Sequence, residues 1–374
     1  MKMITNQRRD FIKKTSLATG ALMASSLSGF NILRAKGAAK KPDVILGHGD
    51  YQYKLVRDWA KLSSTRTPIL NCHEMVMDSK GRLIMMGDHT DNNILIFDKS
   101  GKLLDYWGTQ YPGGHGLTLS KEGEDDFLFM TDSGWHLHHS GKMVKQNGRV
   151  TKSTTDGKVI FDIGHPQTIG VYEPGEEFCP SEVAIGPNGD IYVADGYGMS
   201  RIIQYNANGE YIRHWGGKNA DPNYTLKSAH GVAIDYRDPK NPLVVCTSRQ
   251  EQSFKFYTLE GKWVKTIKLP NMWVCRPVFD GPNLYAGVCW SAPEGGRMNW
   301  REHTGFVTIL EGDKVVSNPG GTAPEYKGKE LQKSYQLADK PIMHGHDVCI
   351  DEDKNLYICQ WNANKTAPLK LERV

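Results

Sequence analysis

Short stretches in which apolar and polar residues alternate recur along the chain, and turns rich in Asn, Gly and Asp separate them. The clearest series predicts four strands, at Ser181–Ile185, Asp190–Asp195, Arg201–Tyr205 and Tyr211–Gly216. β-Branched and aromatic residues at alternate positions, with Pro-Asn-Gly and Asn-Gly turns between them, are signals of β-hairpins. Four strands in roughly 40 to 50 residues make a unit of the size of one β-propeller blade.

Six copies of this unit begin with a residue that stands at the same distance before an apolar triplet. We call this place the register position. The residues at this position are His73, His115, Ser181, His230, Cys275 and His346. Four of the six are histidines, although the whole chain has only 13 His among 374 residues. We therefore predict an all-β fold, a six-bladed β-propeller of the NHL type.

Three blades depart from the common plan. Blade 2 carries an inserted segment around His136, and blade 5 carries an insertion over residues 290–341. The last blade is one strand short, whereas the N-terminal stretch Tyr53–Trp59 resembles the outer strand Tyr211–Trp215 and has no blade of its own. We expect this stretch to complete the last blade and close the ring, because a closed propeller leaves no inner sheet edge unpaired.

The register position also predicts a metal site. The first strand of each propeller blade lines the central channel, so residues at one register position form a ring around the axis. His115, His230 and His346 come from alternate blades and would lie about 120° apart around a sixfold axis. Three imidazole ligands, with the fourth coordination position of the ion left open for water or substrate, are typical of a catalytic zinc site. His73 breaks this threefold spacing and is a possible extra channel residue.

Two alternatives remain at this stage. The histidines could instead cap the starts of strands, with hydrogen bonds to neighbouring blades. Asp347 follows His346 directly, so its side chain would point away from the histidine level, where a carboxylate with backbone carbonyls could hold a calcium ion.

The N-terminus predicts export. Arg8-Arg9 followed by Phe11 and Lys13-Lys14, and then by small and moderately apolar residues, is typical of a twin-arginine signal. We assign residues 1–37 to this signal and residues 38–374 to a single propeller domain, which predicts a periplasmic or extracellular protein. Cleavage would remove seven cations and one anion and change the net charge from +4 to about −2. Nucleic acid is therefore not an expected partner, and residues 38–374 contain no apolar run long enough for a membrane span.

Several motifs resemble those of peptidyl-hydroxyglycine amidating lyase, the second catalytic unit of the peptide-amidating enzyme. They lie around His115, at Phe178–Val183, at Ala194–Arg201, around His230 and at His346–Val348. The resemblance implies that His115, His230 and His346 bind zinc. It also implies that Tyr197 and Arg249 act on the substrate, and that Asp347 helps to bind calcium.

The chain departs from the family at several of its functional positions. Met85–His89 stands where the family has an arginine, Gly198 stands where it has a cysteine, and His73 stands where it has a small residue. Cys179 is thereby left without its usual disulfide partner. The three cysteines Cys246, Cys349 and Cys359 lie in predicted strands among apolar residues, and we interpret them as core residues.

These observations favour an exported zinc-dependent lyase, expected to be a monomer, that cleaves a carbinolamide-like C–N or C–O bond in a small-molecule or peptidic substrate. One alternative is a non-catalytic NHL propeller that binds a protein or a glycan. Another is a metal-dependent lyase or hydrolase that acts on a carbohydrate derivative.

Overall fold

A computed structural model describes residues 43–138 and 140–374. Val44–Val374 form one compact unit. The predicted signal at residues 1–37 lies outside the described residues. The described part contains no helix that is long and apolar enough to cross a membrane.

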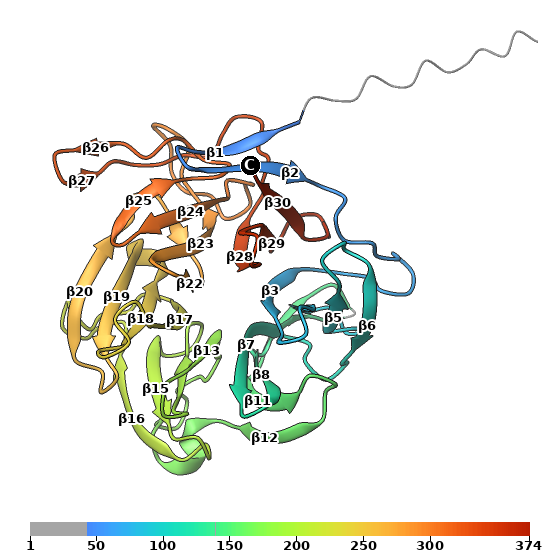
Figure 1. The fold of residues 1–374 in the computed structure, drawn as a ribbon. Coiled ribbons are helices and arrows are strands. Elements are labelled where there is room, and N and C mark those ends of the chain that lie inside the picture. Colours follow the sequence, from blue (N-terminus) through green and yellow to red (C-terminus); the bar gives the residue numbers. More distant parts are fainter. Residues whose placement is uncertain (1–42, 139) are drawn as a thin grey trace, which may run out of the picture. The chain divides into compact units, whose positions relative to one another are not determined.

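Six antiparallel sheets stand around a central axis and confirm the six-bladed β-propeller (Figure 1). Blades 1, 3 and 4 each have four strands in chain order, from the channel outwards. Their strands are β3 (Cys72–Met77), β4 (Leu83–Gly87), β5 (Ile94–Phe97) and β6 (Leu103–Trp107); β13 (Glu182–Ile185), β14 (Ile191–Ala194), β15 (Arg201–Tyr205) and β16 (Tyr211–Gly216); and β17 (Ala229–Asp235), β18 (Leu243–Ser248), β19 (Ser253–Thr258) and β20 (Trp263–Lys268). Two short 3-10 helices, η1 (Pro166–Ile169) and η2 (Arg249–Glu251), lie in connections.

Blade 2 contains a strand that the sequence pattern had not revealed. Its sheet order is β12-β11-β8-β7. The strands are β7 (Gly114–Glu122), β8 (Asp125–Asp132), β11 (Arg149–Thr154) and β12 (Val159–Ile163). The polar sequence of β11 hid it from the pattern. The inserted segment forms a separate hairpin of β9 (Trp135–Leu137) and β10 (Met143–Lys145).

Blade 5 corrects the predicted insertion over residues 290–341. Two regular blade strands, β24 (Phe306–Glu311) and β25 (Lys314–Ser317), lie within that stretch. They pair onto the long strand β23 (Asn283–Trp290), whose other edge pairs with the short strands β21 (Trp273–Val274) and β22 (Val278–Asp280). The inserted chain is therefore confined to the loop between β23 and β24 and to the segment after β25. That segment carries the hairpin of β26 (Tyr326–Lys327) and β27 (Glu330–Leu331).

The last blade joins the two ends of the compact unit and confirms the predicted closure. Its sheet order is β1-β2-β30-β29-β28. The C-terminal part of the chain supplies β28 (Gly345–Ile350), β29 (Leu356–Gln360) and β30 (Leu369–Arg373). The N-terminal part supplies β2 (Tyr51–Val56), which pairs with β30 from Tyr53↔Arg373 to Val56↔Lys370, and an unexpected fifth strand, β1 (Ile45–His48). In Figure 1 the blue β1 and β2 therefore lie beside the dark red β30.

Apolar side chains between adjacent blades form the core in several separate clusters. The cluster beside the closure joins Tyr53 and Leu46 of the N-terminal strands to Leu356 and Leu371 of the C-terminal ones. The predicted core cysteines Cys246, Cys349 and Cys359 are buried. Each cluster joins neighbouring blades, so stability depends on an intact ring.

We expect Tyr53→Ala to destabilise the whole propeller. Tyr53 lies on β2 and is fully buried in a cluster that joins blade 6 to side chains of blade 5 such as Tyr285 and Val307. Loss of a large core side chain costs about 3–5 kcal/mol. Denaturant unfolding measures this loss, and the exposed neighbour Gln52→Ala is the control, expected to change stability by less than about 0.5 kcal/mol. Equal stability of the two variants would contradict the closure as a structural requirement.

Candidate metal centre

The four channel histidines each lie at an irregularity in the innermost strand of a blade. In blades 1, 2, 4 and 6 the register of pairing between the first and second strands shifts at the histidine, which itself has no partner in the second strand. The shifts lie between Cys72 and Glu74, Gly114 and Leu117, Ala229 and Val232, and Gly345 and Asp347. A β-bulge of this kind turns a side chain out of its regular alternation. The bulges therefore direct the four imidazoles to the channel.

Two of the bulges also depend on glycine. Gly116 and Gly231 directly follow His115 and His230. A Cβ atom at Gly116 would lie 2.7 Å from the carbonyl oxygen of Ser181, and one at Gly231 would lie 2.7 Å from the Cα atom of Arg276. Neighbouring blades can thus approach closely at the level of the histidines.

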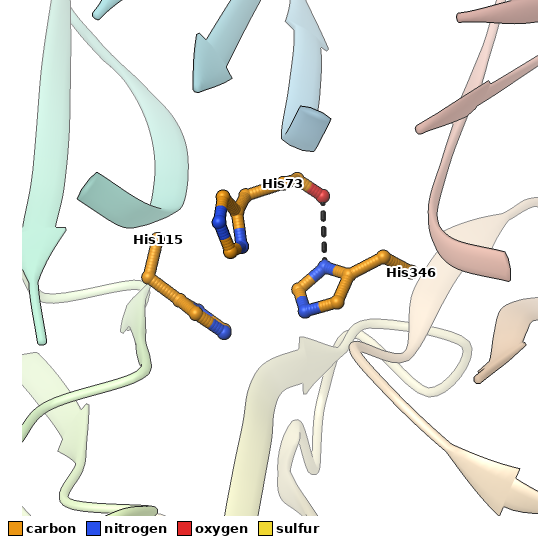
Figure 2. Close-up of side chains that lie close together, drawn as sticks. All are labelled: His73, His115 and His346. Atoms are coloured by element: carbon orange, nitrogen blue, oxygen red, sulfur yellow. Dashed lines mark hydrogen bonds between the residues drawn. The ribbon is translucent and has the colours of Figure 1, made fainter. Parts of the chain in front are cut away.

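The histidine ring, which we define as His73, His115, His230 and His346, is one contact cluster. His115 and His346 touch each other and each of the other two imidazoles, with ring centroids 4.7–5.0 Å apart. Figure 2 shows His73, His115 and His346 turned towards a common centre. The threefold set predicted from the sequence is thus accompanied by His73.

Hydrogen bonds between blades set the tautomers of two of these histidines. Nδ1 of His115 lies 2.7 Å from the carbonyl oxygen of Ser181, and Nδ1 of His346 lies 2.9 Å from that of His73. A carbonyl only accepts, so each Nδ1 carries the proton and each Nε2 keeps its lone pair. Hydrogen bonds to neighbouring blades, considered above as an alternative to metal binding, therefore leave the lone pair of each of these imidazoles on Nε2, the atom that would bind a metal ion.

Burial favours the neutral form of three of the four ring histidines. The four histidines are 1–5% exposed. Burial is the largest cause that lowers the pKa of His115, His230 and His346 well below the ordinary value, and neighbouring histidines and Arg249 lower it further. Neutral imidazoles are the form that binds metal ions.

Among the described residues, two groups of three side chains could hold a metal ion. One is His73, His115 and His346, and the other is His230, Cys275 and His346, with the ligand atoms of each group within 4.8 Å of one another. Nδ1 of His230 is buried and has no hydrogen-bond partner among the described residues. Neutral imidazoles with uncommitted nitrogens fit a transition-metal ion such as zinc.

Tyr197 is held over the ring by a loop built around a buried carboxylate. Asp195 accepts hydrogen bonds from the backbone nitrogens of Cys179 and Met199 and from the Tyr172 hydroxyl, each at 2.7 Å. A Cβ atom at Gly198 would lie 2.3 Å from a carboxylate oxygen of Asp195. This loop therefore has no room for the cysteine of the amidating-lyase motif. All seven cysteines lie among the described residues and are free.

The hydroxyl of Tyr197 bridges two ring histidines. It lies 3.0 Å from Nε2 of His115 and 3.0 Å from Nε2 of His230. Nε2 of His115 has no proton, so the hydroxyl donates to it and accepts from His230. Burial raises the pKa of Tyr197 to about 12, although the charge of Arg249 opposes the shift.

Arg249 lies beside Tyr197 at the entrance to the ring. It begins the 3-10 helix η2 directly after β18, and its guanidinium lies 5.6 Å from the ring centroid of Tyr197 and 5.3 Å from that of Trp290. A cavity of about 400 Å³ opens next to these groups, and Lys218 and Lys227 also line it. The cavity can admit a small molecule and favours an anionic one.

Asp347 lies in a charged cluster rather than in a cation site. Nε and Nη2 of Arg276 donate to its two carboxylate oxygens at 3.0 and 2.8 Å, and the backbone nitrogen of Met75 donates to Oδ2 at 2.9 Å. Arg276 also donates to the carbonyl oxygens of Leu117 and Met75, at 2.7 and 3.1 Å. The carboxylate and the carbonyls that could have held calcium thus surround a guanidinium, so these residues do not fit a calcium ion.

Asp347 belongs to a charged cluster, which we define as Glu74, Glu182, Arg276 and Asp347, and its other three members were not predicted from the sequence. Arg276 lies 3.3 Å from Glu74 and 3.9 Å from Glu182, and all four residues are buried. Burial is the largest cause that raises the pKa of both glutamates, for Glu74 well above the ordinary value. Each member directly follows a residue at the register position. A comparison of the residues at this next position in all six blades could therefore have predicted the cluster.

The fold and the channel define a class, the NHL-type six-bladed β-propellers with a histidine-lined axis. Residues 179–205 match the NHL repeat family. Among solved structures, a gluconolactonase from Xanthomonas campestris aligns over 89% of this chain and 95% of its own, with 11% identity and a TM-score of 0.55. Such a distant likeness shows the fold alone.

Within this class the chain is similar in sequence to the peptide-amidating enzymes. It is 25% identical over 300 residues to peptidyl-glycine alpha-amidating monooxygenase A of Xenopus laevis, which covers 77% of this chain and 28% of the relative. It is 34% identical over 137 residues to peptidyl-alpha-hydroxyglycine alpha-amidating lyase 1 of Drosophila melanogaster, which covers 35% of this chain and 22% of the relative. The alignments thus span less than a third of the length of these relatives.

We expect Arg276→Met to destabilise the protein by about 3–5 kcal/mol, because it leaves buried carboxyl groups without their cation. Lys354→Met is the control. Lys354 pairs with Asp280 at 2.8 Å on the surface, where an ion pair is worth less than about 1 kcal/mol. Denaturant unfolding compares the two variants. Added Ca²⁺ should leave the melting temperature of the wild type unchanged, and a saturable rise would contradict Arg276 as the cation of this cluster.

Proposed function

We propose that this protein is an exported, metal-dependent lyase of the amidating type, which cleaves a carbinolamide-like bond. The observation that carries the proposal is the contact of one tyrosine hydroxyl with two histidines of a buried ring that could bind a metal ion. The sequence similarity to amidating lyases supports the same chemistry. Export rests on the twin-arginine pattern within residues 1–37.

His115, His230 and His346 are the residues that would hold the ion, and zinc is the ion we propose, because three imidazoles with an open position are typical of catalytic zinc. When bound, the ion supplies a positive charge that makes a nearby substrate hydroxyl more acidic. The charged cluster plays no part in cation binding, because Arg276 occupies it.

The proposed substrate has a carbon that bears both a hydroxyl group and an amide nitrogen. In the reaction the O–H and C–N bonds break, the oxygen forms a carbonyl group, and the nitrogen leaves with a proton as an amide. Burial disfavours ionised Tyr197, whereas Arg249 and the charge of a bound ion would favour it. In this form Tyr197 can take the hydroxyl proton and return it to the departing nitrogen, so no net proton is consumed. Arg249, directly beside Tyr197, favours the ionised form and can bind an anionic group of the substrate.

The ring histidines should determine metal content. We expect the wild type to carry one zinc ion per chain and His115→Ala, His230→Ala and His346→Ala each to bind it at least tenfold more weakly. His214→Ala is the control, because His214 lies on the outer strand β16 and is exposed. Elemental analysis after dialysis measures occupancy. A wild type that retains no metal after reconstitution would exclude the lyase and favour a non-catalytic propeller.

Tyr197 should determine turnover rather than metal binding. Tyr197→Phe removes the proton carrier, so we expect the turnover number to fall about 10²–10⁴-fold while metal content persists. The measurement is release of the aldehyde product from an N-acyl-α-hydroxyglycine. Tyr211→Phe is the control, because that hydroxyl bonds to His214 on the outer strand. Unchanged turnover in Tyr197→Phe would contradict this role.

A further inference from the structure

His73 differs from the other ring histidines in its hydrogen bonds. Its Nε2 lies 3.2 Å from Oδ2 of Asp88, a carboxylate that follows β4, whereas its Nδ1 is buried and has no partner among the described residues. A carboxylate accepts a hydrogen bond, so Nε2 carries the proton and the lone pair is on Nδ1. His73 is therefore in the tautomer that a ligand bound through Nδ1 requires.

Asp88 is itself held in place. The backbone nitrogen of Asn71 donates to Oδ1 at 2.9 Å, and the side-chain nitrogen of Asn71 donates to Oδ2 at 2.7 Å. Asn71 is in turn fixed to blade 6, because its side-chain oxygen accepts from the backbone nitrogen of Asn362 at 2.8 Å. A metal-bound histidine commonly donates its second N–H to such a carboxylate, which fixes the orientation of the ring.

His73 also lies within reach of an ion in the ring. His115 and His346 are the two imidazoles that touch both His73 and His230. His73, His115 and His346 bring their ligand atoms within 4.8 Å of one another. Figure 2 shows the His73 ring beside these two, while its carbonyl oxygen accepts from His346.

We infer that His73 is a fourth imidazole ligand of the metal ion, through Nδ1, and that Asp88 is its positioning residue. The inference rests on the proposed metal site and extends it. Four protein nitrogens leave room for a substrate only if the ion accepts at least a fifth ligand. The ring should therefore favour ions that readily take five or six ligands, such as Co²⁺ or Fe²⁺, more than a three-histidine site would.

The test uses the full chain, freed of metal and titrated with Co²⁺ in competition with a chelator. His73→Ala should weaken Co²⁺ binding at least tenfold, and the visible absorption of bound Co²⁺ should intensify as the coordination number falls. Asp88→Asn should weaken binding roughly tenfold to a hundredfold. Asp91→Asn is the matched control, because it removes the same charge three residues away on an exposed side chain whose contact is with His89.

Wild-type affinity and spectrum in both His73→Ala and Asp88→Asn would overturn the inference. The proposed function would survive that result if His115→Ala, His230→Ala and His346→Ala still lost metal. If the metal-free wild type does not bind a metal ion at all, the proposed function is overturned instead. If His73→Ala does not fold, as judged by circular dichroism, Asp88→Asn decides alone, because Asp88 makes the bond that sets the tautomer.

Discussion

The pairing of β2 with β30 is the constraint on which the rest of the structure depends. It joins residues separated by almost the whole compact unit, and it gives the last blade its outer strands. The histidine ring draws its members from blades 1, 2, 4 and 6, so no part of the chain contains the candidate centre by itself. The site exists only when the two ends have met, which couples metal binding to completion of the fold.

Along the channel, the level of the histidine ring and the charged cluster are formed by consecutive residues of the sequence. His73, Cys275 and His346 belong to the level of the histidine ring, and the residues that follow them, Glu74, Arg276 and Asp347, belong to the charged cluster. A buried carboxylate needs a cation, and Arg276 supplies one permanently because a guanidinium does not lose its proton in proteins. Arg276 is thus the cation of the charged cluster, and the imidazoles of the ring remain as the ligands for an exchangeable ion.

Much of the fold could be predicted because each blade repeats a local pattern of strands and turns. The prediction failed where local signals are weak. The strand Arg149–Thr154 consists largely of polar residues, and the third and fourth strands of blade 5 were concealed within a stretch interpreted as an insertion. The closing strand was found because Tyr53–Trp59 resembles a known outer strand, whereas β1 has no counterpart in the repeat.

The candidate site, like the fold, could be predicted from the sequence only in part. The register brought the histidines to attention, but spacing alone could not show that His73 joins them, because the contact depends on the bulges that turn each imidazole. Nor could spacing reveal Arg276, whose partners Glu74, Leu117 and Asp347 come from three other blades. Contacts between blades are set by the closed ring and carry no local signal.

Contacts close to each loop, rather than the bulges of the channel strands, fix the positions of Tyr197 and Arg249. Asp195 fixes the Tyr197 loop by bonding to backbone nitrogens on both sides of it, and Gly198 fills a position with no space for a side chain. Arg249 is placed by the end of β18 and packs between two aromatic rings. Loops on a rigid scaffold can change without disturbing the core. Gly198, a departure from the amidating-lyase motif, lies in this layer, so the loop can differ while the ring stays intact. The departure at Met85–His89 reaches deeper, because Met85–Gly87 belong to β4 and Asp88 contacts His73 of the ring.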